Sequence, residues 1–175
     1  MRVRDLTLLA LLIALTTAAT MAIRIPVPAT GGYINLGDSM VYISALLFGP
    51  LAGLVAGGIG SALADWFGGY LQFAPYTLVI KGVEGLVVGI LAWALLRSRP
   101  RPGVAGVIGS IVAIFVGGAL MVAGYYAVER FIMGQAAAAE VPGNIFQVVG
   151  GLIVAIPVAL LLRNVAPAMR SSAGR

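Results

Sequence analysis

The sequence predicts an all-α integral membrane protein, a compact bundle of six transmembrane helices with both termini in the cytoplasm. Three observations point to this class. Hydrophobic residues make up 61% of the 175 residues, only 10% are charged, and the mean hydropathy is +1.05. Soluble domains carry about 25% charged residues, so too few charges remain here to cover a surface that faces water. The apolar residues also form long runs, and the arginines cluster between them.

Six apolar runs define the expected helices, which together form a single transmembrane domain over residues 1–175. They cover residues 6–23, 39–48, 51–66, 75–97, 104–129 and 144–163. The first run ends at Pro26 and Pro28, because each proline removes a backbone donor and disfavours helix in the residue before it. Gly49 and Pro50 divide the second run from the third. Residues 29–37 are expected to form a structured loop rather than a helix.

The positions of the cations predict the orientation. Eight of the eleven Lys and Arg residues fall on one side of the expected bundle: Arg2, Arg4, Arg97, Arg99, Arg101, Arg163, Arg170 and Arg175. Membrane proteins concentrate Lys and Arg in their cytoplasmic segments. We therefore expect both termini to be cytoplasmic, as an even number of spans also requires.

Several function classes are disfavoured by composition. The chain has no cysteine and no histidine, so a disulfide, a thiol nucleophile and an imidazole metal site are all excluded. It has no phosphate-binding Gly-rich loop followed by Lys and Ser or Thr, and its serines have no base to activate them. We therefore expect no enzyme activity, no cofactor and no metal. Because the arginines sit in short clusters between apolar runs, membrane lipid rather than nucleic acid is the expected partner.

Two charged residues lie inside the fourth expected helix. Lys81 and Glu84 are three positions apart, so they share a helix face and can pair. Charges inside a bilayer cost about 2.5–3.5 kcal/mol each on insertion scales. They form either an ion pair that fastens helices together or the polar floor of a ligand pocket that opens outward.

Polar and aromatic residues gather toward the expected outer side of the membrane. They are Tyr33, Asn35, Asp38, Asp65, Trp66, Gln72, Phe73, Tyr76, Tyr125, Tyr126, Glu129, Asn144 and Gln147. Each has an ordinary alternative role, such as a helix cap for Asp38 or an interface anchor for the aromatic residues. Together they suit a planar, polar heterocycle better than an ion.

Small residues recur every four positions on the first expected helix, at Ala10, Ala14, Ala18 and Ala22. This spacing places them on one face, where another helix can approach closely. That helix belongs either to the same bundle or to a separate membrane protein. The similar spacing of Gly53 and Gly57, and of Gly85 and Gly89, favours packing between helices of the same chain.

Five short motifs between residues 35 and 89 carry a family resemblance. They are Asn-Leu-Gly-Asp (35–38), Leu-Phe-Gly-Pro (47–50), Gly-Ser-Ala-Leu-Ala-Asp (60–65), Phe-Ala-Pro-Tyr-Thr-Leu (73–78) and Ile-Lys-Gly-Val-Glu-Gly (80–85). With these motifs the chain resembles the S components of energy-coupling factor (ECF) vitamin transporters, in particular the riboflavin-type subgroup. The six expected helices, the cytoplasmic termini and the chain length extend the resemblance to nearly the whole sequence.

The resemblance implies a substrate-binding subunit in a bacterial or archaeal plasma membrane. Such a subunit binds a vitamin from outside and works with a transmembrane coupling protein and two cytoplasmic ATPase subunits. It implies a substrate pocket formed by Asn35, Asp38, Asp65, Gln72, Tyr76, Lys81 and Glu84. It also implies that Ala10 and Ala14, with Ala18 extending the same register, dock on the coupling protein. The repeat continues to Ala22, which leaves open which pair docks.

The expected substrate is a small water-soluble vitamin or precursor of the pyridoxine, hydroxymethylpyrimidine or riboflavin type. Heavily anionic ligands are disfavoured, because Lys81 is the only obvious cation deep in the spans. Two rival hypotheses are a stand-alone small-solute carrier or channel without an ATPase partner, and a structural or assembly subunit that binds no small molecule.

Overall fold

Helices make up nearly all of the chain in the computed structural model, which describes residues 2–28, 32–96 and 103–165. The elements in chain order are α1 (Val3–Ala22), β1 (Arg24–Val27), β2 (Gly32–Asn35), α2 (Gly37–Phe48), α3 (Pro50–Val55), the π-helical turn η1 (Ala56–Gly60), α4 (Ser61–Gly68), α5 (Ala74–Leu96), α6 (Val104–Met133), the 3₁₀ segment η2 (Gly134–Ala139) and α7 (Val141–Val165).

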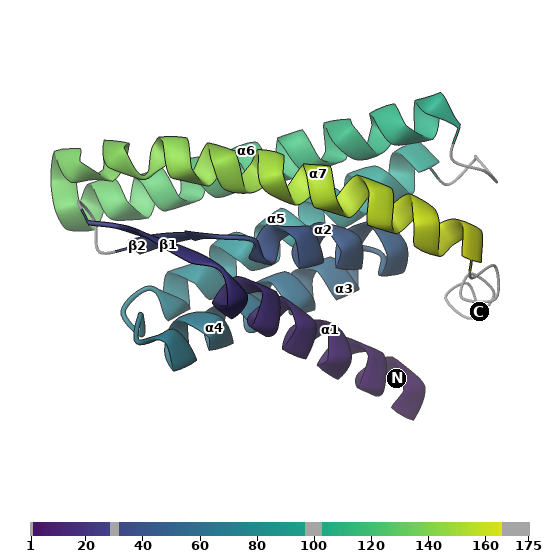
Figure 1. The fold of residues 1–175 in the computed structure, drawn as a ribbon, viewed down its shortest axis with the longest axis horizontal. Helices are drawn as coiled ribbons and strands as arrows, with labels where there is room; N and C mark the ends of the chain where they lie inside the picture. The colour runs from purple at the N-terminus through teal and green to yellow at the C-terminus, as the bar shows by residue number, and fades with distance from the viewer. Residues whose placement is uncertain (1, 29–31, 97–102, 166–175) are drawn as a thin grey trace.

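The helices lie roughly along one common direction (Figure 1). The long helices α6 and α7 pack side by side on one face of the bundle, and α1 lies on the opposite face. Between them, α5 packs against α6 and α3, while α2 packs against α7, α5 and α1. The start of α1 and the end of α7 lie at one end of the molecule, whereas the two strands, the end of α4 and the junction between α6 and α7 lie at the other (Figure 1).

Close glycine contacts allow α3 and α5 to cross. A Cβ atom added to Gly53 would lie 2.3 Å from the carbonyl oxygen of Gly85, and one added to Gly85 would lie 2.2 Å from that of Gly53. The two backbones can touch at this point only because both residues lack a side chain. This confirms that these glycines pack helices of the same chain against each other.

The helix between Pro50 and Gly68 is continuous but not uniform. Gly49, with φ of +89°, ends α2 in a conformation that favours glycine, and Pro50 starts α3 at a position that tolerates its missing N–H. The chain then passes through the π-helical turn η1 without a break. The two short runs expected around residues 49 and 50 are thus α2 and the composite helix α3–η1–α4.

The observed helix ends differ from the expected ones by at most four residues. The largest extension is at α6, expected to stop at residue 129 but continuing to Met133. Glu129 does not mark the end because its side chain is buried inside the bundle. At α7 the helix begins at Val141 instead of residue 144, since Pro142 is accommodated in the first turn.

The segment after α1 forms a two-stranded antiparallel hairpin where the sequence predicted a structured loop. Its register pairs Arg24 with Asn35 and Val27 with Gly32. The hairpin lies in the half of the bundle that carries the α6–α7 junction, and its strands run alongside α7 (Figure 1). Its second strand leads directly into α2.

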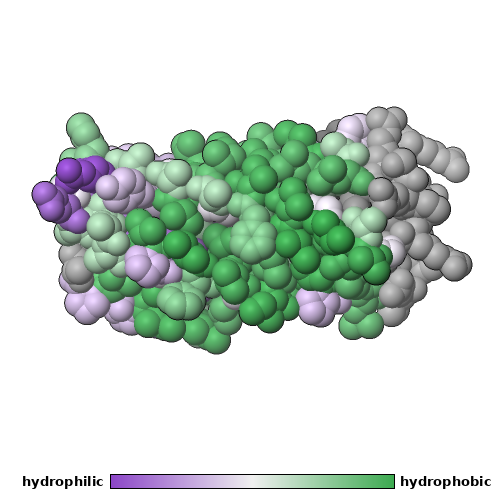
Figure 2. Space-filling model, turned by 90° about the horizontal axis from the view of Figure 1, so that it is seen from above, coloured by the Kyte–Doolittle hydropathy of each residue, from purple (hydrophilic) through white to green (hydrophobic). Residues whose placement is uncertain are grey.

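Five helices of the described chain are long and apolar enough to cross a membrane: Val3–Ala22, Pro50–Gly68, Ala74–Leu95, Val104–Ala139 and Val141–Leu162. Figure 2 shows the apolar band that they present on one side of the molecule, with polar side chains gathered toward the hairpin end. The sixth expected span is α2, which has 12 residues, of which nine are buried. At about 1.5 Å per residue it is about 18 Å long, short of the roughly 30 Å hydrocarbon core. It lies inside the bundle rather than against lipid.

Candidate functional site

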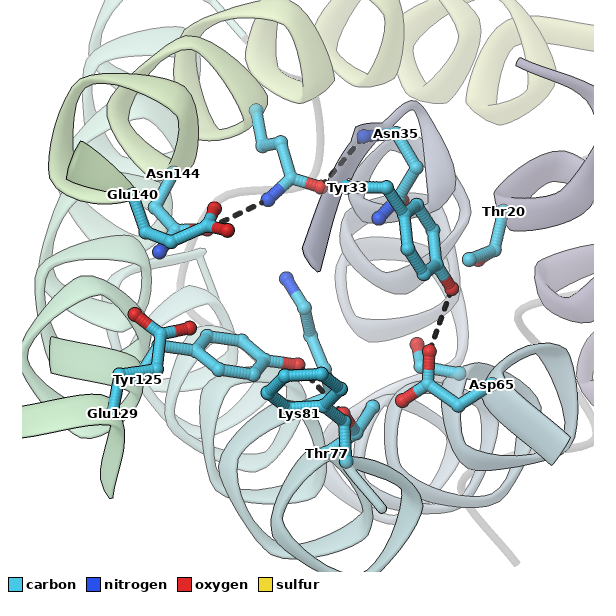
Figure 3. Close-up of a pocket in the computed structure, with 13 residues that line it drawn as sticks. Thr20, Tyr33, Asn35, Asp65, Thr77, Lys81, Tyr125, Glu129, Glu140 and Asn144 are labelled. Atoms are coloured by element: carbon cyan, nitrogen blue, oxygen red, sulfur yellow. Dashed lines mark hydrogen bonds between the residues drawn. The ribbon is translucent and has the colours of Figure 1, made fainter. Parts of the chain in front are cut away.

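A cavity lies at the hairpin end of the bundle, with about 490 Å³ of space between its lining atoms, part of it open to solvent. We call it the pocket. Six elements contribute side chains to it: α1, β2, α4, α5, α6 and α7, joined by Glu140 from the junction between α6 and α7. Most of these side chains are polar, and they point toward a common centre in Figure 3.

A buried cluster of charges lies at the base of the pocket. The ammonium of Lys81 donates hydrogen bonds to Asp38 and, at 3.0 Å, to Glu84. Glu84 also accepts a hydrogen bond from the hydroxyl of Tyr42 at 2.7 Å. Lys81 lines the pocket, whereas Asp38 and Glu84 do not. Because buried charges need partners, this cluster joins α2 to α5 and also supplies part of the pocket floor. The two alternatives weighed for Lys81 and Glu84 are therefore compatible.

Asp65 connects α4 to the hairpin. One of its carboxylate oxygens accepts a hydrogen bond of 2.6 Å from the hydroxyl of Tyr33. Burial, and after it the nearby charge of Asp65, raise the pKa of Tyr33 above its ordinary value. The phenol therefore stays protonated at neutral pH and remains a donor. The guanidinium of Arg24 lies 4.9 Å from the centre of the Tyr33 ring, and Tyr70 packs against the same ring at 4.5 Å between centres. These contacts hold β2 over the pocket.

Asn35 connects the hairpin to α7. Its backbone N–H donates to the side-chain oxygen of Gln147 at 2.9 Å, and the amide nitrogen of Gln147 donates to Asn144 at 2.9 Å. The side-chain oxygen of Asn35 accepts from the N–H of Gly37 at 2.8 Å, which fixes the turn into α2. The strand that covers the pocket is therefore tied on one side to α4 and on the other to α7.

The wall built by α5 and α6 carries further polar groups. Tyr125 donates a hydrogen bond to Thr77 at 3.0 Å, and its ring centre lies 5.9 Å from the Lys81 ammonium. One turn further along α6, Glu129 is only 5% exposed, and Glu140 in the junction before α7 is 3% exposed. In Figure 3, Glu129 and Glu140 lie on one side of the pocket and Asp65 lies on the other.

Among the residues predicted to bind substrate, the structure brings Asn35, Asp65 and Lys81 to the pocket surface and places Asp38 and Glu84 directly behind Lys81. Gln72 and Tyr76 are not brought there. Gln72 is exposed in the turn before α5, and Tyr76 is 41% exposed. Tyr76 directly precedes the pocket residue Thr77, and successive helical residues are rotated by about 100°, so the two side chains face different directions.

Other lining residues were not singled out as substrate-binding. Tyr33, Phe73, Tyr125, Glu129, Asn144 and Gln147 belong to the polar and aromatic group expected on the outer side, and the pocket brings all six together. Thr20, Ser61, Thr77 and Glu140 were missed. The hydroxyl residues lie within apolar helices, where a single Ser or Thr gives no signal of its own. In the described part of the chain, no group of three His, Cys, Asp or Glu residues is arranged to hold a metal ion.

The alanines of α1 face away from the bundle. Ala10, Ala14 and Ala18 are exposed, whereas Leu12 and Thr16 on the opposite face are buried. Packing inside the bundle therefore does not explain the alanine repeat, and the interpretation as an internal contact is wrong.

Comparison with known proteins gives one family. The family model described as "ECF-type riboflavin transporter, S component" matches residues 1–164. A protein of Pyrococcus woesei described as uncharacterised is 42% identical over 79% of this chain and 87% of its own length. The thiamine precursor transporter HmpT of Lactococcus lactis is 28% identical over 87% of this chain and 84% of its own length.

A solved structure of the S component of a bacterial ECF transporter has the same fold. It superimposes with a TM-score of 0.65 at 20% identity and covers 94% of this chain and 96% of that one. The polar pocket under a hairpin, the apolar helix bundle and the family match agree. The chain belongs to the S-component family of ECF-type riboflavin transporters, the substrate-binding membrane subunits of ECF vitamin importers.

Proposed function

We propose that this protein captures a small water-soluble vitamin or vitamin precursor, of the pyridoxine, hydroxymethylpyrimidine or riboflavin type, from outside the cell. The observation that carries the proposal is the pocket, in which side chains from helices far apart in the sequence converge beneath a hairpin. The relative that transports a thiamine precursor is similar over most of both chains. The residues proposed to contact the vitamin are Asn35, Asp65 and Lys81, with Asp38 and Glu84 supporting Lys81.

The pocket is proposed to open to the outside of a bacterial or archaeal plasma membrane, with both termini in the cytoplasm. Arg2 and Arg4 stand at the start of α1, at the end of the bundle away from the hairpin. The bias of Lys and Arg toward the cytoplasmic side supports a hairpin end that faces outside. The six-span arrangement over residues 1–175 is part of this proposal, with α2 as the short inner span.

The partners are proposed to be a transmembrane coupling protein and two cytoplasmic ATPase subunits, which would hydrolyse ATP on behalf of this chain. The exposed stripe of Ala10, Ala14 and Ala18 on α1 supports a docking face for the coupling protein, because small side chains let two helices approach closely in lipid. A large apolar side chain in this stripe would keep the helices apart.

A binding and uptake experiment tests the proposal. The purified protein is first examined by native mass spectrometry for a co-purified small molecule, and it is then titrated with pyridoxine, hydroxymethylpyrimidine and riboflavin. Uptake is measured in cells that express the chain with and without an ECF coupling module. Binding of one of these compounds, and uptake that needs the module and ATP, are the expected results. Uptake whose rate is unchanged by ATP depletion but is abolished by an ionophore would support a stand-alone carrier instead.

A further inference from the structure

The carboxylates of this chain are concentrated around the pocket. The sequence contains six Asp and Glu residues. Asp65, Glu129 and Glu140 line the pocket, and Asp38 and Glu84 lie behind its floor. Only Asp5 is elsewhere, in the first turn of α1. A membrane protein keeps few charges in its helices because each is costly. The cost of placing these carboxylates around one pocket is reduced when a hydrogen-bond donor or a positive charge lies among them.

The positive charge of Lys81 is already engaged by two carboxylates. Its ammonium contacts both Asp38 and Glu84, so these three side chains together carry one net negative charge. Arg24, which is near Asp65, stacks on Tyr33 and donates to the carbonyl of Ala64 at 3.1 Å, and it does not line the pocket. Among the residues described, Lys81 is thus the only cation on the pocket surface.

Glu129 carries a buried acceptor atom that a ligand could satisfy. It is 5% exposed, it lines the pocket, and its Oε2 atom has no hydrogen-bond partner in the described structure. A buried carboxylate oxygen without a donor is costly. Asp65 shows the same feature across the pocket, since its Oδ2 atom has no partner while Oδ1 accepts from Tyr33. Both acceptors border the same enclosed space (Figure 3).

We infer that the pocket selects a heterocycle that carries an amino group or a ring nitrogen that can be protonated, and that Glu129 accepts a hydrogen bond from the N–H of that group. Asp65 faces the ligand from the opposite side and adds a second acceptor. This inference rests on the proposed function and narrows its substrate class. It favours amine-bearing compounds such as hydroxymethylpyrimidine over riboflavin, which is uncharged and lacks a free amine. Phosphorylated or carboxylated ligands are disfavoured by repulsion from the surrounding carboxylates.

A matched pair of ligands tests this inference. Hydroxymethylpyrimidine, which carries an exocyclic amine, is compared with its oxo analogue, in which a carbonyl oxygen replaces the amine. Riboflavin is the uncharged reference. Binding to the purified full-length protein is measured by isothermal titration. The amine is expected to bind at least about tenfold more tightly than the oxo analogue, since a hydrogen bond to a charged group contributes that much. Equal or tighter binding of the oxo analogue or riboflavin overturns the inference.

Glu129→Gln identifies the acceptor. The substitution keeps the size of the side chain and removes its charge, and it is expected to reduce the preference for the amine over the oxo analogue by about tenfold. Asp5→Asn is the matched control, because Asp5 lies outside the pocket. The Asp5→Asn protein should show the same preference for the amine over the oxo analogue as the parent protein. Melting curves of both variants establish that they fold. A folded Glu129→Gln protein with the parental preference contradicts the assignment.

The same measurements separate this inference from the proposed function. If riboflavin binds at least as tightly as the amine and its uptake requires the ECF module, the proposed function stands and the selection for an amine fails. If none of the compounds binds and uptake does not depend on the module, the proposed function fails and the substrate class fails with it.

Discussion

At the scale of single residues, the charges behind the pocket show what sequence spacing can and cannot reveal. The pairing of Lys81 with Glu84 was predictable, because residues three apart on a helix are neighbours. The second partner, Asp38, is 43 positions away and reaches Lys81 only through the packing of α2 on α5. No local pattern encodes such a contact. The same reason explains why Tyr33 was not recognised as the partner of Asp65.

We predict that Lys81→Ala destabilises the protein by about 3–5 kcal/mol, because it leaves two buried carboxylates without their cation. Thermal unfolding in detergent micelles measures the change, and vitamin affinity should fall in the same variant. The variant that also carries Asp38→Asn and Glu84→Gln should regain most of the stability, since no uncompensated charge remains. Unchanged stability of Lys81→Ala would mean that the three charges are not coupled.

We predict that Tyr33→Phe speeds vitamin release, because the hydrogen bond that holds β2 to Asp65 is lost. A hydrogen bond to a charged group contributes about 1.5–3 kcal/mol, which corresponds to roughly a tenfold to hundredfold faster dissociation. Stopped-flow displacement measures the rate. Tyr126→Phe is the matched control, because Tyr126 is 40% exposed and does not line the pocket, and its rate should equal that of the parent.

At the scale of helices and strands, hydropathy located the elements but not their function. The long apolar runs predicted α1, α5, α6 and α7 to within a few residues. The hairpin was expected only as a structured loop, since Pro26 and the glycines around it hide the short strands. Gln72 and Tyr76 were predicted because they are polar groups on the expected outer side, but the rotation of α5 turns Thr77 toward the pocket instead. Helix rotation depends on packing against neighbours, which a single sequence does not show.

We predict that Gly85→Ala forces α3 and α5 apart, because the added methyl carbon would lie 2.2 Å from the carbonyl oxygen of Gly53. Overpacking of this kind costs about 1–3 kcal/mol, to be measured as a lower unfolding temperature in micelles. Gly150→Ala in α7 is the control, since its added carbon would meet Leu36 at an ordinary distance of 3.7 Å. Equal stability of the two variants would rule out a tight crossing at Gly85.

We predict that Ala14→Leu abolishes uptake while leaving vitamin affinity nearly unchanged, because Ala14 is exposed on α1 and lies outside the pocket. The bulkier side chain blocks the close approach of a partner helix. Uptake by cells and binding by the purified protein are measured in parallel. Ala119→Leu, at an exposed site on α6, should retain both. Loss of binding together with uptake would show that α1 is not a docking face.

At the scale of the whole molecule, charge is divided between the two ends. The pocket, with most of the carboxylates, lies at the hairpin end, and Arg2 and Arg4 lie at the other. The sequence predicted this division, because charge positions relative to apolar runs are a linear property of the chain. The pocket itself required the fold, because its walls come from six elements between α1 and α7.

We predict opposite labelling of single cysteines at the two ends, a clean experiment because the chain contains no cysteine. Gln72→Cys, exposed in the turn before α5, should react in intact cells with a maleimide that cannot cross the membrane. Arg2→Cys should react only after the cells are opened. The reverse pattern would place the pocket in the cytoplasm and contradict capture from outside.

The short, buried helix α2 has a consequence for biosynthesis. With 12 residues and a carboxylate at Asp38, it is too short and too polar to partition into lipid when it leaves the ribosome. Its charge is neutralised only when Lys81 of α5 arrives, 43 residues later in translation. Insertion of α2 is therefore expected to be delayed until α5 has emerged. Nascent chains truncated before Lys81 should leave this segment accessible to protease.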